Sequence, residues 1–147
     1  MIALLPVSLV TAGAIALLNF WLMLRVGQVC RAVGISVGDG GHEPLVRRMR
    51  AHANLVESAP FVLLLIALVE LADGPSLILW IVAAAYVAAR LAHAIGMDGW
   101  MPGRMIGTIV SMLAMVGLGI AAIVIAARGV PPRAPARGIT TYAVPKG

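Results

Sequence analysis

The sequence has little charge and almost no cysteine. Charged residues make up 12% of the 147 residues, against about 25% in soluble domains, while hydrophobic residues reach 61%. This balance excludes an ordinary soluble fold and indicates that lipid is the solvent. The single cysteine, Cys30, cannot form an intrachain disulfide, so no redox compartment follows from it, and its simplest interpretation is a small packing residue near a helix end.

Acidic residues are also scarce. Six Asp and Glu stand against eleven Lys and Arg, which gives a formal net charge of +5. Such an excess can indicate nucleic-acid binding, but here the arginines lie between apolar runs and form no continuous basic face. We therefore expect charge at a membrane surface and no nucleic-acid partner. The three histidines, His42, His52 and His93, lack metal-ligand spacing, so no metal site is predicted.

Long apolar runs are the main feature of this sequence. The uncharged run 2–24 meets the requirement of about 20 residues for crossing the hydrocarbon core, and glycine and proline clusters separate it from three further helical segments. Residues 2–24 exceed the apolar region of a signal peptide, so they are expected to stay as a helix. The pattern predicts one domain over residues 1–128, an all-α integral membrane four-helix bundle. Its helices are expected at about 2–31, 44–72, 75–97 and 103–128.

The C-terminal segment differs from the rest. Residues 129–147 are rich in proline and arginine and have no apolar period, which predicts a disordered tail. Orientation follows from basic residues, which flank the first and third connectors and are absent from the turn at Asp73. Both connectors are therefore expected to be cytoplasmic, although the basic residues of the tail argue the other way.

A polar stripe marks the start of the second predicted helix. At about 100° per residue, Arg47, Arg50, Asn54 and Glu57 share one face, and Glu57 lies about 10 Å along the axis from Arg50. A charge at this depth costs about 2.5 to 3.5 kcal/mol, so it normally faces the bundle and finds a partner. Arg47 is more simply interpreted as a residue at the membrane interface. For the others a ligand site is expected, and a structural ion-pair network is the alternative.

The third and fourth predicted helices bring partners to the same layer. Arg90 and His93 are three residues apart, hence on one face, and antiparallel packing places them level with the stripe. Arg104 begins the fourth helix in that layer. The result is a predicted pocket with several guanidiniums, a carboxylate, an amide and an imidazole, which suits a small zwitterionic peptide. An arginine aimed at a thiol would stabilise its thiolate.

Residues 50–57, RAHANLVE, followed by Pro60, resemble the helix-two signature of the MAPEG family, the membrane-associated proteins of eicosanoid and glutathione metabolism. Arg90 and His93, with Arg104 further on, are similar to elements of that family's third and fourth helices. The resemblance spans roughly residues 25–127. It implies a bacterial-type member in the inner membrane, a homotrimer with glutathione bound between neighbouring subunits.

The same resemblance implies an activity, a glutathione-dependent transferase or peroxidase that acts on lipophilic electrophiles. Arg104 would stabilise the thiolate and is the implied catalytic residue. The implied glutathione-binding residues are Arg50, Asn54, Glu57, Arg90 and His93.

Two positions depart from the family pattern, because Ser58 and Met97 stand where members often carry aromatic residues. A non-catalytic glutathione- or lipid-binding regulator therefore remains an alternative. A small four-helix transporter is a remote one, since such transporters place an essential carboxylate in the first helix and this chain has none there.

Overall fold

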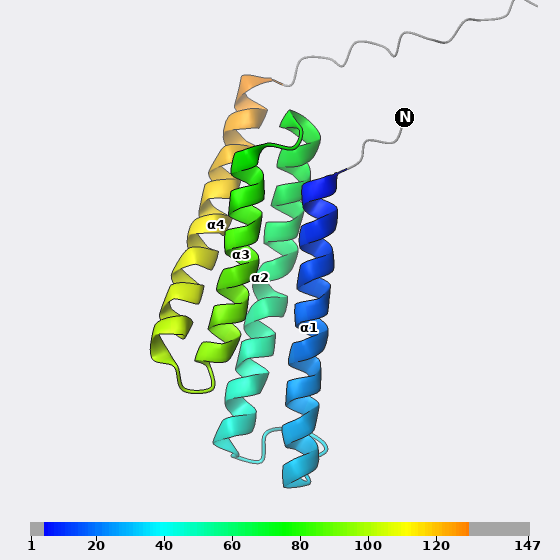
Figure 1. Ribbon diagram of the computed structural model, residues 1–147, viewed down its shortest axis with the longest axis vertical. Helices are drawn as coiled ribbons and strands as arrows, with labels where there is room; N and C mark the ends of the chain where they lie inside the picture. Colours follow the sequence, from blue (N-terminus) through cyan, green and yellow to red (C-terminus); the bar gives the residue numbers. More distant parts are fainter. Residues whose placement is uncertain (1–4, 130–147) are drawn as a thin grey trace, which may run out of the picture.

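Four α-helices make up most of the described part of the protein, which in this computed structural model is residues 5–129. They are α1 (Pro6–Val33), α2 (Glu43–Asp73), α3 (Leu77–Gly96) and α4 (Met101–Arg128) (Figure 1). The described residues contain no strand. All four helices are long and apolar enough to cross a membrane, which confirms the predicted all-α membrane fold. Of the predicted tail, only Gly129 is described, and residues 130–147 lie outside.

Local sequence determines where the helices begin and end. Ser76 precedes α3, and its Oγ accepts a hydrogen bond from the backbone N–H of Leu79 at 3.2 Å, a standard N-cap. At the end of α1, Gly34 adopts φ 69°, which lets the N–H of Ile35 reach the carbonyl of Cys30 at 3.1 Å. Helices α1, α2 and α4 each have a proline in the first turn, where the missing N–H costs nothing. These prolines are Pro6, Pro44 and Pro102.

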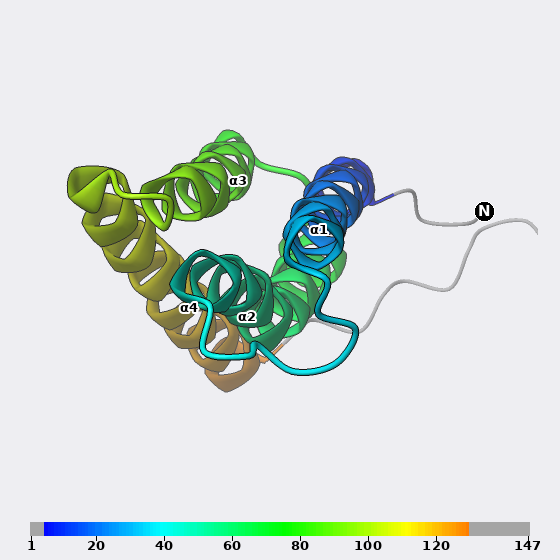
Figure 2. The same ribbon diagram turned by 90° about the horizontal axis from the view of Figure 1, so that it is seen from below.

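The helices run up and down, so that two connectors, residues 34–42 and 97–100, lie at one end of the bundle. We call it the lower end, as drawn in Figure 1, and the end with the α2–α3 turn the upper end. Seen from below, α4 begins beside α3 and crosses the bundle until its far end lies beside α2 (Figure 2). This crossing separates the lower halves of α2 and α4.

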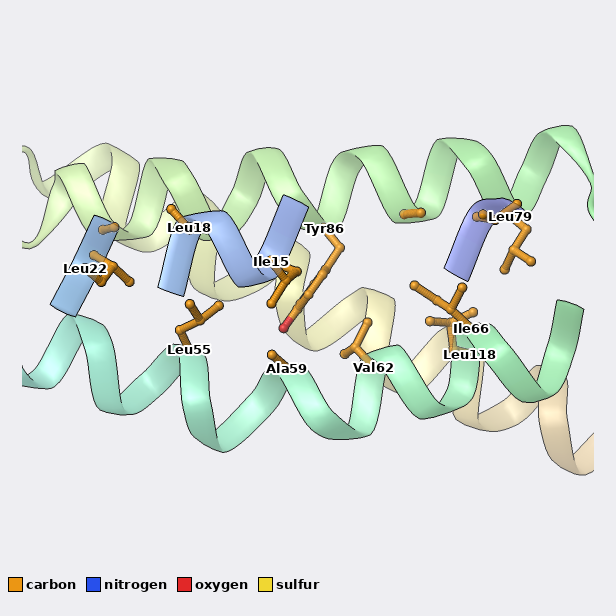
Figure 3. Close-up of a cluster of buried hydrophobic side chains, with 13 residues drawn as sticks. Ile15, Leu18, Leu22, Leu55, Ala59, Val62, Ile66, Leu79, Tyr86 and Leu118 are labelled. Atoms are coloured by element: carbon orange, nitrogen blue, oxygen red, sulfur yellow. The ribbon is translucent and has the colours of Figure 1, made fainter. Parts of the chain in front are cut away.

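A continuous apolar core joins the four helices (Figure 3). On α2, Leu55, Ala59, Val62 and Ile66 recur every three to four residues, so they form one inward face. Tyr86 of α3 is fully buried against this face. The outward faces are apolar as well, as expected for helices surrounded by lipid, where the backbone bonds internally and side chains meet hydrocarbon.

At the upper end, a buried carboxylate ties α2 to the start of α1. Glu70 is only 2% exposed, and its two oxygens accept hydrogen bonds from the backbone N–H groups of Val7 and Ser8, at 2.9 and 2.8 Å. The Ser8 hydroxyl donates a third bond at 2.6 Å. The first N–H groups of a helix have no partner within the helix and carry partial positive charge. Glu70 therefore caps α1 from a neighbouring helix.

Pro60 lies inside α2, between Glu57 and Glu70. Because proline has no N–H, the carbonyl of Val56 loses its usual helical partner at this point. Pro60 thus divides α2 into a lower half with the polar stripe and an upper half that is apolar down to the buried Glu70.

Candidate functional site

A cavity of about 500 Å³ opens among the lower halves of α2, α3 and α4. Its size is within the range of small-molecule sites. Five of the six residues predicted from sequence line it together, and only Arg90 does not. The lining residues are Arg50, Ala53, Asn54, Glu57, His93, Met97, Arg104 and Thr108.

The α2 wall of the cavity carries the polar stripe. Arg50, Asn54 and Glu57 follow one another at helical spacing on the cavity face, with Arg50 and Glu57 exposed and Asn54 half-buried. Neither Arg50 nor Glu57 forms an ion pair with another residue of the range 5–129. A structural ion-pair network within one chain therefore does not account for these two charges.

The opposite wall is built by α3 and α4, which approach each other backbone to backbone. A Cβ atom at Gly107 would lie 2.5 Å from the carbonyl oxygen of Ala89 and 2.6 Å from Cβ of His93, so only glycine fits there. Gly96, the last residue of α3, lies directly against the backbone N of Arg104. Small residues of this kind permit close helix packing in membranes. They hold Arg104 and His93 on one rigid wall.

His93 is the buried member of this wall. The side chain is 5% exposed, and its Nδ1 has no hydrogen-bond partner among the described residues. A buried polar atom without a partner costs free energy, and native proteins rarely leave one unsatisfied. The His93 side chain thus lines the cavity while its Nδ1 is buried in the wall.

Arg90 lies in the interior of the bundle and outside the cavity lining. It is 3% exposed, and its Nε has no partner among residues 5–129. Residues three apart on a helix differ by about 60° in direction, enough to turn His93 to the cavity and Arg90 away from it. Its role as a ligand-binding residue stays a prediction.

A second polar cluster lies below the cavity and was not found from the sequence. Arg25 of α1 forms an ion pair with Asp98 in the α3–α4 connector, and it donates to the carbonyl of Ala94 at 3.2 Å. Arg48 of α2 donates to the carbonyl of Arg25 at 3.1 Å, and its Nε lies 3.6 Å from Asp98. Asp98 is the one acid in the connector 97–100, and this position among basic helix ends could have indicated an ion pair from the sequence.

Four helices long and apolar enough to cross a membrane, with a polar cavity lined by three of them, define a polytopic α-helical membrane protein. The model of the MAPEG family matches residues 8–124, most of the chain, so the protein belongs to the MAPEG family, as its resemblance indicated. This family includes glutathione transferases and peroxidases as well as other members. A search of curated proteins found no match, and a search of solved structures found none either.

Proposed function

We propose that this protein is a glutathione-dependent membrane transferase or peroxidase that acts on lipophilic electrophiles. One observation carries the proposal: the guanidiniums of Arg50 and Arg104 and the carboxylate of Glu57 line the same cavity, and none of the three is paired with another described residue. Charges left free at a common cavity favour a ligand that carries opposite charges of its own.

Glutathione matches this set of groups, because it has two carboxylates, an ammonium, amide groups and a thiol. In the proposed complex, Arg50 binds a carboxylate by paired hydrogen bonds, and Glu57 accepts the ammonium. Asn54 can donate to and accept from the peptide, and the side chain of His93 lines the same cavity. Arg90 adds a positive charge in the interior, one turn before His93.

Arg104 acts on the thiol. A guanidinium beside the sulfur favours the thiolate, which is the reactive nucleophile. In conjugation, the thiolate attacks an electrophilic carbon, the new C–S bond forms and the leaving group departs with its electron pair. In peroxide reduction, the thiolate attacks the distal oxygen, the O–O bond breaks, and the alkoxide leaves with the electron pair and takes a proton to become an alcohol. A second glutathione then converts the sulfenic acid to the disulfide and water.

A second copy of the chain would complete the site. Arg50, Glu57 and Arg104 are exposed on the single chain, and a charge facing lipid costs several kcal/mol in the hydrocarbon layer. Covering this face with a neighbouring subunit removes that cost. This supports an oligomer with glutathione between subunits, and for the number of subunits we propose the homotrimer that the family resemblance implies. The lower end, with its arginine-rich flanks, faces the cytoplasm of a bacterial inner membrane.

Calorimetric titration of glutathione against the purified protein in detergent tests the proposal, with subunit stoichiometry measured on the same sample. We expect saturable binding and conjugation of glutathione to a generic aryl halide. Absence of binding in a folded, oligomeric sample would refute the proposed function.

A non-catalytic binding protein is the second candidate, and two positions favour it. The hydroxyl of Ser58 lies 3.2 Å from that of Tyr86, within the bundle, and Met97 presents a thioether to the cavity. Neither position offers the aromatic side chain that family members often have there. This candidate predicts glutathione binding without conjugation, so the same two assays separate it from the enzyme.

A further inference from the structure

The two walls of the cavity are formed by different helices. One wall is α2. The other is the hairpin of α3 and α4, which Gly96, Gly103 and Gly107 join backbone to backbone. A Cβ at Gly103 would lie 2.9 Å from the carbonyl oxygen of Ala92, so only glycine permits this close approach of α3 and α4. The width of the cavity therefore depends on what holds this hairpin to α2.

Polar contacts hold the walls together above and below the cavity. Above it, Ser58 of α2 meets Tyr86 of α3 at 3.2 Å. Below it, Asp98 of the hairpin pairs with Arg25 and lies 3.6 Å from Nε of Arg48 on α2. These polar contacts join the two walls in addition to the apolar core.

Arg25 is more deeply buried than the arginine of an ordinary surface ion pair. The side chain of Arg25 is 11% exposed, and its guanidinium carbon lies 4.6 Å from the ring centre of Trp21. It also donates to the carbonyl of Ala94 on α3, while Arg48 donates to the carbonyl of Arg25. A charge held in this way is largely removed from water, so loss of its partner leaves it uncompensated.

We propose that Asp98 is a positioning residue which, through Arg25 and Arg48, fixes the distance between α2 and the α3–α4 hairpin and so sets the width of the ligand cavity. The effect on glutathione rests on the proposed function, whereas the effect on the distance between the walls does not.

Electron spin resonance measures this distance directly. Met49 on α2 and Met105 on α4 are both exposed and stand on opposite walls at the lower end. Spin labels are attached to the cysteines of the double variant Met49→Cys and Met105→Cys, in a Cys30→Ser background. Labelled protein is diluted with unlabelled protein, so that the measured distances are those within one chain. We expect Asp98→Ala to shift the distance distribution to longer and broader values.

Matched variants separate positioning from general damage. Asp98→Glu keeps the charge and should restore the wild-type distance, while Arg48→Gln should give an intermediate one. Asp73→Asn removes an exposed acid at the upper end and should change neither distance nor binding. We expect the Kd for glutathione to rise about tenfold in Asp98→Ala, the effect of losing roughly one charged contact, and to stay within twofold of wild type in Asp98→Glu.

Each outcome decides something. An unchanged distance in a folded Asp98→Ala protein overturns the proposal, as does a longer distance with unaltered glutathione affinity. If Asp98→Ala does not fold, Arg48→Gln and Asp98→Glu give the same comparison. If the wild type does not bind glutathione, the proposed function fails, and the distance measurement alone still decides whether Asp98 positions the hairpin.

Discussion

Two glutamates on one helix have opposite surroundings. Glu70, in the upper half of α2, is buried and accepts three hydrogen bonds from the first turn of α1. Glu57, thirteen residues earlier, is exposed at the cavity and forms no ion pair with any described residue. The carboxylate of Glu70 thus has hydrogen-bond partners within the protein, whereas that of Glu57 has no ion-pair partner among the described residues. The first holds the fold together, and the second is available to a ligand.

The same contrast separates the two ends of the bundle. At the upper end, the buried carboxylate of Glu70 has all its hydrogen-bond partners on α1. In the lower half, Arg50, Arg104 and His93 share a cavity with Glu57. Their side chains have polar groups without a partner among the described residues. The comparison predicts that changes at the upper end affect stability and changes at the cavity affect ligands.

The largest effect is expected from Arg104→Ala. Removing a charge that stabilises a developing or resting anion typically lowers turnover by about 10² to 10³. Since Arg104 is exposed on the single chain, the thermal stability of the variant should change little. The measurement is conjugation to an aryl halide at saturating glutathione, with Arg128→Ala, at the upper end of α4, as the control. Turnover equal to that of wild type would show that Arg104 does not stabilise the thiolate.

The next effect is on stability and concerns Glu70→Ala. The substitution leaves the N–H groups of Val7 and Ser8 unpaired in an apolar surrounding, which costs about 2 to 3 kcal/mol. Thermal unfolding in detergent should show a lower Tm, while the Kd for glutathione of the folded fraction stays unchanged. A loss of glutathione affinity with normal Tm would reverse the roles of the two glutamates.

A smaller effect is expected from Glu57→Gln, the matching change in the lower half. If Glu57 accepts the ammonium as proposed, loss of its charge should raise the Kd for glutathione about tenfold, or roughly 1.4 kcal/mol. Because Glu57 bonds to no other described side chain, the Tm should be equal to that of wild type or slightly higher. Glutathione with a blocked amino group should bind both proteins equally weakly, and a persistent difference would contradict the assignment of Glu57 to the ammonium.

The smallest effect is expected from Glu43→Gln. Glu43 and Arg47 form an ion pair one turn apart on α2, and their side chains are 73% and 45% exposed. Such pairs contribute about 0.3 to 0.5 kcal/mol, and this one ties no two helices together. Chemical denaturation should barely distinguish the variant from wild type. A loss above about 1 kcal/mol would mean that exposed charge at the lower end stabilises the fold after all.

Much of the fold was predictable because it rests on local patterns. Uncharged runs of membrane length and the glycine and proline clusters between them are enough to define four helices. The common face of Arg50, Asn54 and Glu57 follows from helix geometry alone, and all three line the cavity.

What remained hidden depends on how the helices are rotated and crossed. Arg90 shares a helix with His93, but a rotation of about 60° takes it to the interior. The partners of Glu70 lie 62 and 63 residues away, and those of Asp98 lie on two other helices, α1 and α2. No periodicity within one helix reveals contacts of that range. The imidazole of His52 beside the amide oxygen of Asn19, at 2.9 Å, is a further example.

Pro60 has a consequence for how such a chain can evolve. It stands between the half of α2 that lines the cavity and the half that anchors the neighbouring helix, and it removes one backbone hydrogen bond between them. Substitutions below it can retune what the protein recognises while the anchor above it keeps the subunit intact. A single proline thus lets selection act on specificity and on folding as nearly separate traits.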